Sequence, residues 1–379
     1  MRFLVCLLFF THLGIGQQVD YFPDRDSWET VSPAKFGISE SLIEEAIDSI
    51  KSNEYTGPKD LRQAILRGFQ REPYHEILGP TKKRGGPAGM IIKNGYKIAE
   101  WGDINRVDMT FSVTKSYLST MAGLALDQGL INSIDDKVSE YVWDTTFDGS
   151  HNEKISWRHL LEQSSAWSGQ LWGGYDWHDR PPREGDPYEW RKATNAEPGT
   201  EMEYNDVRVN VLAYSLLQVW RTPLPAILKE KIMDPIGAST TWRWFGYDNS
   251  WTTVDGIKMQ SVSGGGHSGG GLFISTEDHA RFGLLCLNKG IWNGKRLLSE
   301  EWLDMATTSS KPNPNYGFMW WLNQDGDRMS NLSKEGFYAA GFGGNYIIVE
   351  PDDQLVIVLR WCEPSQANRM LGLIMQAME

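Results

Sequence analysis

Cysteine is scarce in this sequence. The 379 residues include three cysteines, and Cys6 lies in an apolar N-terminal stretch that we expect to be removed. The remaining two, Cys286 and Cys362, are too few for the disulfide framework that holds small secreted domains together. One pair and two buried thiols both fit the sequence, and in either case a hydrophobic core has to stabilise a chain of this length.

Positive charge and long apolar runs are also scarce. The net charge of −12 argues against a nucleic-acid partner, because phosphate binding requires a basic face. No stretch reaches the ~20 apolar residues that span a bilayer, so we expect no stable membrane insertion. The first sixteen residues, MRFLVCLLFFTHLGIG, combine one arginine, a short apolar run and small residues. This pattern is typical of a secretory signal peptide over residues 1–16 and predicts a secreted or periplasmic protein.

Glycine and tryptophan, by contrast, are abundant, with 38 and 17 residues, as is typical of a large-cored enzyme with many tight turns. Hydrophobic periodicity predicts helices over residues 37–50, 112–127 and 205–220. Two antiparallel hairpins are predicted at 88–102 and 345–361, the first because Asn94-Gly95 suits a two-residue turn. Because strand-like runs from both ends of the chain flank the helices, an antiparallel sheet with a helical insertion fits better than a doubly wound parallel sheet.

The stretch FSVTKSY, residues 111–117, places a serine three positions before a lysine. On a helix, Ser112 and Lys115 would lie on one face, about one turn apart. A serine hydroxyl is a weak nucleophile without a nearby base, and lysine acts as that base only if its pKa is lowered. The alternative is a solvated helix start, since S-x-x-K patterns often arise by chance.

A tyrosine immediately precedes the helix predicted at 205–220. It belongs to the stretch PGTEMEYNDV, residues 198–207. A phenol at a helix start, near a lysine, can move a proton between a nucleophile and a leaving group. Tyr204 is therefore a candidate for that role, although an ordinary half-buried tyrosine with a hydrogen-bonded hydroxyl also fits the pattern.

Four stretches, in order along the chain, resemble the penicillin-recognising serine hydrolases: class C β-lactamases, D-alanyl-D-alanine peptidases, family VIII carboxylesterases and nylon-oligomer hydrolases. FSVTKSYLSTMAGLALDQGLI is similar to the family's nucleophile helix, and ISWRHLLEQSSAW to its ITxRHLLxxTSG segment. PGTEMEYNDV is similar to its PGxxxxYSN motif, and GGGLFISTEDHARFG to its GGLxSTAxDLARF stretch. The resemblance extends from about residue 85 to the C-terminus.

The resemblance implies an α+β fold of the β-lactamase/transpeptidase type. In such a fold an antiparallel sheet is flanked by helices, and a cleft separates it from an all-helical lobe. Residues 17–379 would form this one domain, with the sheet lobe at about 35–110 and 270–379 and the helical lobe at about 111–269. This arrangement agrees with the order of elements predicted from the periodicity.

The same resemblance implies that Ser112 is the nucleophile, Lys115 its partner and Tyr204 the general base or proton relay. The sequence departs from the family at two places. Asp206 replaces the usual asparagine and would favour a protonated lysine. The stretch YAAGFGGN has no lysine or histidine where the family has a cation for the substrate carboxylate, so an ester is favoured over a β-lactam or a peptide. The backbone near Gly341 can still supply an N–H group for an oxyanion hole.

Substrate contacts are expected from four positions, Asp206, His267, Trp172 and Gly341. Trp172 belongs to an aromatic-rich stretch that walls the cleft in the resembled family, although a role in the core fits as well. His267 lies in GHSGG, a glycine-rich loop that would let the chain pass close to the cleft. GHSGG also matches the G-x-S-x-G elbow with Ser268 as nucleophile, but an apolar run rather than a helix follows it, and the one later histidine, His279, is too close in sequence for the relay.

These observations predict an exported serine hydrolase that cleaves a small ester or amide through an acyl-enzyme on Ser112. No histidine spacing indicates a metal, and we expect no cofactor. Within the family, a true β-lactamase or a D-amino-acid peptidase is the alternative. A non-catalytic protein that grips glycan or peptidoglycan fragments with its tryptophan-rich stretch is the alternative from another class, and the sequence leaves the oligomeric state open.

Overall fold

The structure is a computed structural model that describes residue 19 and residues 21–181, 184–192 and 196–378. The signal peptide expected at residues 1–16 therefore lies outside the described residues. None of the helices within the described ranges has both the length and the apolar character that crossing a bilayer requires.

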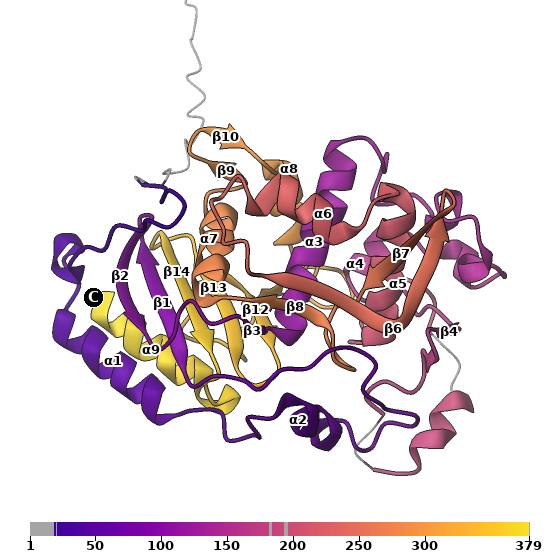
Figure 1. Cartoon of the computed structure of the whole chain (residues 1–379), viewed down its shortest axis with the longest axis horizontal. Coiled ribbons are helices and arrows are strands. Elements are labelled where there is room, and N and C mark those ends of the chain that lie inside the picture. The colour runs from indigo at the N-terminus through magenta and orange to yellow at the C-terminus, as the bar shows by residue number, and fades with distance from the viewer. Residues whose placement is uncertain (1–18, 20, 182–183, 193–195, 379) are drawn as a thin grey trace, which may run out of the picture.

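Strands from both ends of the chain form a six-stranded antiparallel sheet (Figure 1). The two ends meet where β1 pairs with β14, with Met90 opposite Val358. The prediction of one antiparallel sheet made from both ends of the chain is confirmed. The strands, in their order across the sheet, are β11 (Trp321–Leu322), β12 (Phe337–Gly341), β13 (Asn345–Glu350), β14 (Leu355–Arg360), β1 (Ala88–Lys93) and β2 (Tyr96–Trp101).

Both predicted hairpins are present in this sheet. The turn between β1 and β2 is made by Asn94 and Gly95, with φ angles of 51° and 89°, which is the left-handed backbone that a two-residue turn of this kind requires. A Cβ atom at position 95 would lie 1.8 Å from the carbonyl oxygen of Tyr21, so glycine is also needed for close packing. The second hairpin joins β13 to β14.

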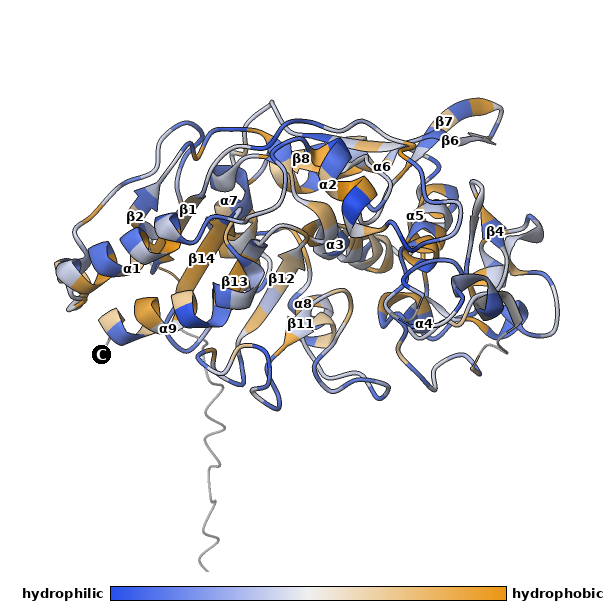
Figure 2. Ribbon diagram, turned by 90° about the horizontal axis from the view of Figure 1, so that it is seen from below, coloured by the Kyte–Doolittle hydropathy of each residue, from blue (hydrophilic) through white to orange (hydrophobic). Residues whose placement is uncertain are grey.

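Helices cover both faces of the sheet, which explains why its strands are apolar on both sides. Met90 and Ile92 of β1 belong to one core with Phe282 of α7 (Thr276–Leu287). Ile91, which points to the other face, belongs to a second core with residues of α1 (Glu40–Ser52) and α9 (Ala367–Met378). Figure 2 shows the apolar strands beside α9, which carries both polar and apolar residues along its length.

A second sheet runs beside the first and leads to the site. Its order is β3 (Asp108–Met109), β8 (Gly271–Ile274), β6 (Arg243–Val254) and β7 (Ile257–Val262). The β6–β7 hairpin lies in the range 111–269, which was expected to be helical. The sequence signal that we missed is Asp255-Gly256, whose φ angles of 52° and 80° make the hairpin turn.

Arg360 connects the two sheets. Its guanidinium group donates to Asn345 Oδ1 at 2.7 Å, and to the carbonyl oxygens of Ile274 and Met109 at 3.0 and 3.1 Å. The last residue of β14 is thereby tied to both β8 and β3. Because β3 leads directly into Ser112, this buried cation fixes the position of the nucleophile relative to the sheet.

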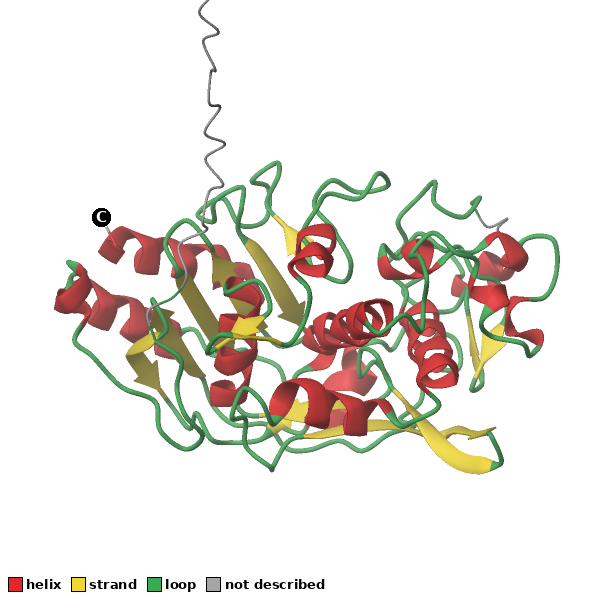
Figure 3. Ribbon diagram, turned by 90° about the horizontal axis from the view of Figure 1, so that it is seen from above, coloured by secondary structure: helices red, strands yellow, loops and turns green. Residues whose placement is uncertain are grey.

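Helices occupy the middle of the molecule, with the six-stranded sheet on one side of them and a loop-rich part of the chain on the other (Figure 3). α3 (Thr114–Asp127) is buried on nearly all sides and packs against α5 (Asp206–Trp220). A helix was predicted over 112–127, but the α-helix begins at Thr114, and Ser112 lies in the preceding 3-10 turn η2 (Phe111–Val113). The remaining elements are α2 (Leu61–Gly68), α4 (Trp157–Leu161), α6 (Leu224–Leu228), α8 (Glu300–Ala306), the π-helical turn η7 (Lys229–Met233), the 3-10 turns η1 (Pro33–Phe36), η3 (Val138–Glu140), η4 (Thr145–Phe147), η5 (Asn152–Lys154), η6 (Pro187–Lys192) and η8 (Pro364–Gln366), and the short strands β4 (Gln170–Leu171), β5 (Gly174–Tyr175), β9 (Ile291–Trp292) and β10 (Lys295–Arg296).

The two cysteines of the described chain are unpaired. Cys286 and Cys362 are both buried free thiols. Burial raises the pKa of Cys362 to about 12, which keeps the thiol protonated and unreactive. Of the two alternatives that the sequence left open, the structure shows buried thiols.

Replacing Ile357 by alanine tests the central core. Ile357 of β14 has no exposed surface, whereas Ile257 of β7 is 60% exposed and provides a matched control. We expect Ile357→Ala to lower the free energy of unfolding by about 2–5 kcal/mol, because it removes buried methylene groups and leaves a cavity. Ile257→Ala should lower the free energy of unfolding by well under half of that amount. Urea unfolding of both variants measures the difference, and equal losses would contradict the assigned core.

Candidate active site

Ser112 is held at the start of α3 by a sharp turn. Phe111 has a φ angle of 50°, a left-handed conformation that is uncommon for a residue other than glycine. The backbone N–H of Thr110 donates to the carbonyl oxygen of Leu272 in β8, so the sheet fixes the turn on its other side. Ser112 is partly exposed and lines a cavity of about 550 Å³, a volume suited to a small molecule.

Lys115 lies directly beside Ser112 and is almost wholly buried. Its Nζ atom donates to Ser112 Oγ at 3.0 Å and to Asp206 Oδ1 at 2.6 Å. Burial by itself would lower the pKa of Lys115, but the charge of Asp206 and its hydrogen bond, together with Tyr204, leave this pKa above its ordinary value. Lys115 is therefore an ammonium group that donates a hydrogen bond to the serine oxygen, rather than a free amine that could accept the serine proton.

Asp206 is shared by three cationic groups. Besides Lys115, Arg180 Nη2 lies 2.5 Å from Asp206 Oδ2, and His267 Nδ1 lies 3.4 Å from the same oxygen. Burial would raise the pKa of Asp206, but Lys115 and Arg180 hold it well below its usual range. A second carboxylate, Asp179, accepts from Arg180 Nη1 at 2.7 Å and from the backbone N–H of Asp206. The aspartate that replaces the family's asparagine is thus fully ionised and neutralised.

Tyr204 lies between two positive charges. Its ring centroid is 4.7 Å from Lys115 Nζ and 5.0 Å from the guanidinium carbon of Arg180. The other side of the ring is supported by Trp321, stacked with centroids 5.8 Å apart and planes 19° apart. Tyr204 lines the same cavity as Ser112. Tyr204 therefore stands beside the Lys115 ammonium at the wall of the cavity, where a group that moves protons is required.

The end of β12 approaches the nucleophile because Gly341 has no side chain. A Cβ atom at this position would lie 2.2 Å from the carbonyl oxygen of Thr110. Gly341 also lines the cavity with Ser112. The backbone of β12 is therefore close to the serine, where an N–H group for a developing oxyanion is required.

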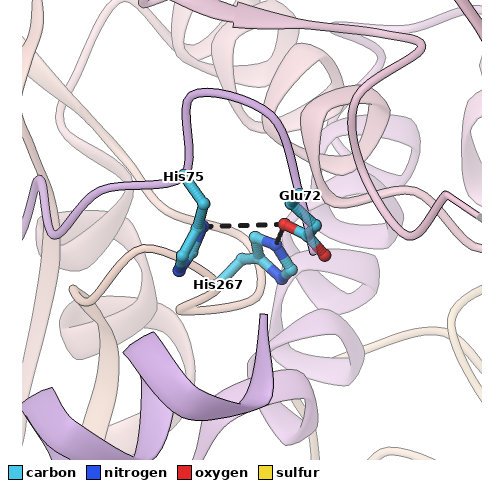
Figure 4. Close-up of side chains that lie close together, drawn as sticks. All are labelled: Glu72, His75 and His267. Atoms are coloured by element: carbon cyan, nitrogen blue, oxygen red, sulfur yellow. Dashed lines mark hydrogen bonds and ion pairs between the residues drawn. The ribbon is translucent and has the colours of Figure 1, made fainter. Parts of the chain in front are cut away.

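The glycine-rich loop between β7 and β8 passes close to the ion pair of Lys115 and Asp206. A Cβ atom at Gly265 would lie 1.8 Å from Asp206 Oδ1 and 2.5 Å from Lys115 Nζ, so only glycine fits there. His267 of this loop lines the cavity and is 8% exposed. Its Nε2 atom is 2.5 Å from Glu72 Oε2 (Figure 4). Burial would lower the pKa of His267, but Asp179, Asp206 and Glu72 raise it to about 9.

The rival serine is not part of this arrangement. Ser268 lines a smaller cavity of about 50 Å³ rather than the cavity of Ser112. The ring of His279, which the elbow mechanism would need, is buried and hydrogen-bonded at both nitrogens, to Thr110 Oγ1 at 2.7 Å and Tyr117 Oη at 2.9 Å. Trp172 also lines the smaller cavity, where its ring meets that of Tyr247 edge-on with centroids 6.0 Å apart.

Of the residues singled out from the sequence, the structure brings together Ser112, Lys115, Tyr204, Asp206, His267 and Gly341 around one cavity, and it does not bring Trp172 to that cavity. Residues that sequence reasoning missed are Arg180 and Glu72. Arg180 lies in the irregular stretch GGYDWHDRPPREGDP, where no pattern in the sequence indicated a role for it. Glu72 precedes the region that carries the motifs, and no signal in the sequence pointed to it.

Two groups of side chains have the residue types of a metal site. Glu72, His75 and His267 form one, and Asp179, Asp206 and His267 the other, with possible ligand atoms within 4.8 Å of one another. The 2.5 Å distance between Glu72 and His267 is that of a charged hydrogen bond. Two ligands on one zinc ion lie further apart, at roughly 3.3 Å for bonds of about 2.0 Å. The geometry fits a proton shared by the pair.

Comparison with known proteins identifies the family of this chain. The Beta-lactamase family model matches residues 105–361, and the chain therefore belongs to the beta-lactamase family. The 6-aminohexanoate-dimer hydrolase of Paenarthrobacter ureafaciens is 25% identical over 287 residues, which cover 68% of this chain and 67% of that protein. The family resemblance predicted from the four stretches is confirmed, and the chain is a serine hydrolase of this family.

Solved structures support the same fold. A family VIII carboxylesterase aligns with a TM-score of 0.56 at 16% identity and covers 78% of this chain and 93% of its own. A beta-lactamase from Mycobacterium bovis aligns with a TM-score of 0.53 at 20% identity, over 77% of this chain and 93% of that one. The predicted α+β fold of the β-lactamase type is confirmed.

Replacing Gly265 by alanine tests the packing around the ion pair. The added methyl group would overlap Asp206 Oδ1 and force it away from Lys115, whereas a methyl group at Gly86 would meet no atom within 4 Å, so Gly86→Ala serves as the control. We expect Gly265→Ala to lose most hydrolytic activity and about 1–3 kcal/mol of stability, the usual cost of overpacking. Ester hydrolysis and thermal unfolding measure both effects. Full activity in Gly265→Ala would contradict the assigned geometry.

Proposed function

We propose that this protein hydrolyses small esters, and more slowly amides, through an acyl-enzyme on Ser112. The observation that carries the proposal is the 3.0 Å contact between Ser112 Oγ and the buried ammonium of Lys115, at the wall of a cavity that Tyr204 also lines. A non-catalytic binding protein, the alternative from another class, would have no need of this costly buried cation beside a serine.

The charges of the site assign the proton steps. Lys115 keeps its proton and lowers the energy of negative charge on Ser112 Oγ as that oxygen attacks the substrate carbonyl. Tyr204 accepts the serine proton, because it lines the cavity with Ser112 and lies beside the Lys115 ammonium. The same phenol then returns the proton to the leaving alcohol, and in the second half it takes a proton from the attacking water and gives it back to Ser112.

The developing oxyanion would be bound by backbone N–H groups. One comes from Ser112 itself, at the start of α3, and the other from the end of β12 at Gly341, which the missing side chain brings close to the serine. Preorganised donors of this kind are commonly the largest single contribution to catalysis of acyl transfer.

The walls of the cavity favour an apolar substrate. Aromatic rings from several elements line it, among them Phe69, Phe111, Trp321, Tyr338 and Phe342. The stretch YAAGFGGN, where the resembled family carries its cation, has no lysine or histidine, which favours an ester over a substrate that is held by a terminal carboxylate. The proposal also keeps the chain as an exported enzyme, on the strength of the apolar stretch at residues 1–16.

Three variants test the catalytic assignment. Ser112→Ala removes the nucleophile and should lower kcat for 4-nitrophenyl butanoate by at least ~10³-fold. Tyr204→Phe removes only the phenol oxygen and should lower kcat by ~10²–10⁴-fold, the usual contribution of a general base. Ser268→Ala, the control at the rival serine, should retain wild-type rates. Loss of activity in Ser268→Ala together with normal rates in Ser112→Ala would overturn the assignment.

A β-lactamase or D-amino-acid peptidase is the second candidate, and Arg328 favours it. Arg328 lines the cavity, with its guanidinium carbon 4.2 Å from the ring centroid of Trp321. Lys115, Arg180 and His267 each contact a carboxylate, but Arg328 forms no ion pair within the described part of the chain. The nearby Asp325 accepts instead from Asn315 and from the backbone of Asp327. An exposed cation at a cavity, with no ion-pair partner among the described residues, suits a substrate with a carboxylate.

Arg328→Gln separates the two candidates. If a cephalosporin is a substrate, the variant should lower kcat/KM for it by roughly 10- to 100-fold, as expected for losing a hydrogen bond to a charged group. Hydrolysis of neutral 4-nitrophenyl butanoate should not change. Efficient ester hydrolysis without turnover of the cephalosporin, and with no effect of the variant, would exclude the second candidate.

A further inference from the structure

Glu72 enters the site from a part of the chain outside the family match. It follows α2, well before residue 105, where the family match begins. The side chain is buried, and its Oε2 atom lies 2.5 Å from His267 Nε2. Its other oxygen accepts from the backbone N–H of Arg180 at 3.2 Å. Figure 4 shows Glu72 and His75 on one loop and His267 on another, with dashed lines from the Glu72 carboxylate to both rings.

Buried positive and negative charges alternate from this carboxylate to the nucleophile. Glu72 contacts His267, whose Nδ1 atom lies 3.4 Å from Asp206 Oδ2. Asp206 in turn contacts Lys115, which donates to Ser112. Asp179 and Arg180 form a second pair across this row. The cluster therefore contains three carboxylates and three cations, and its balance depends on a protonated His267.

We propose that Glu72 and His267 are positioning residues that hold Asp206, and through it Lys115, in the arrangement that Ser112 requires. The inference rests on the proposed function, because Ser112 and Lys115 are its catalytic groups. Glu72 acts at a distance from the substrate, through the proton that it keeps on His267. A loop outside the family region would in this way help to position the catalytic lysine.

The surroundings of His267 show why the Glu72 charge matters. The charged and titratable groups that face the ring are Glu72, Asp179, Asp206, Arg180 and His75. Phe69 packs on the ring with centroids 3.9 Å apart and excludes water on that side. Arg180 and burial both disfavour a positive charge on His267. The three carboxylates together have to outweigh these two effects to keep the ring protonated. Without the negative charge of Glu72, His267 would lose its proton at a lower pH, and Asp206 Oδ2 would lose one of its two cationic partners.

Glu72→Gln tests this inference, with Glu76→Gln as a control because Glu76 is exposed on the same loop. The readout is the titration of His267, followed by NMR of protein labelled with ¹⁵N at its seven histidines and assigned with His267→Gln. We expect His267 to titrate near pH 9 in the wild-type protein, and at least about one pH unit lower in Glu72→Gln, since a lost charge contact is typically worth that much. Glu76→Gln should leave the titration unchanged.

Kinetics give a second readout that a purely structural role would not move. In Glu72→Gln the alkaline limb of the kcat profile should shift to lower pH, and kcat at pH 8 should fall roughly tenfold or more with little change in KM, because the catalytic groups lose alignment. Glu72→Asp keeps the charge, so its pH profile and its kcat should both lie closer to those of the wild-type protein. This difference between the two variants is expected even if they lose the same thermal stability.

Two results overturn the inference. One is a His267 titration that is the same in the wild-type protein and in Glu72→Gln. The other is an equal loss of kcat in Glu72→Gln and Glu72→Asp with no shift of the pH profile. The titration of His267 does not depend on catalytic activity. If Ser112→Ala proves to be fully active, the proposed function is wrong, but the titration still tests the link between Glu72 and His267.

Discussion

The buried ion pair between Lys115 and Asp206 is the interaction on which the site depends. Both groups are almost wholly buried and lie 2.6 Å apart. Breaking such a pair by removing one partner typically costs about 3–5 kcal/mol, because the other charge is left buried and uncompensated. The surrounding chain is shaped to avoid that cost. Gly265 leaves room for the contact, and Arg180 neutralises the oxygen of Asp206 that Lys115 does not reach.

The ion pair also decides which group can act as the base. A lysine beside an ionised aspartate retains its proton, so it can stabilise the serine oxygen but cannot deprotonate it. Tyr204 lines the cavity, and its ring lies beside both Lys115 and Arg180, at centroid distances of 4.7 and 5.0 Å. The charge of the aspartate that replaces the family's asparagine is compensated in the structure by Arg180 and His267 as well as by Lys115.

Much of the fold followed from local patterns in the sequence. The hairpin at residues 88–102 was predicted from its Asn94-Gly95 turn, and the hairpin at residues 345–361 from its two apolar strands. Both predictions were correct, because these signals are local in the sequence. The hairpin that turns at Asp255-Gly256 was missed although its signal was equally local. The start of α3 was misplaced by two residues, because a positive φ at Phe111 cannot be read from a phenylalanine.

The site was only partly predictable for a different reason. Ser112 and Lys115 are neighbours in the sequence, and a family motif carries Tyr204, so short-range patterns sufficed to bring them forward. Arg180 and Glu72 reach the site from irregular loops, where no periodicity fixes the direction of a side chain, and their roles follow only from the charges that they meet in space. Trp172 was chosen because its aromatic-rich stretch walls the cleft in the resembled family, and it lies at the smaller cavity.

The central claim is that Ser112 is the activated nucleophile of this cluster. Its most direct test is to react the folded protein with a fluorophosphonate, which traps activated serines covalently, and to locate the adduct by peptide mass spectrometry. The account predicts one phosphonyl group, on the peptide that contains Ser112. An adduct on Ser268, or no adduct on folded protein, would contradict it.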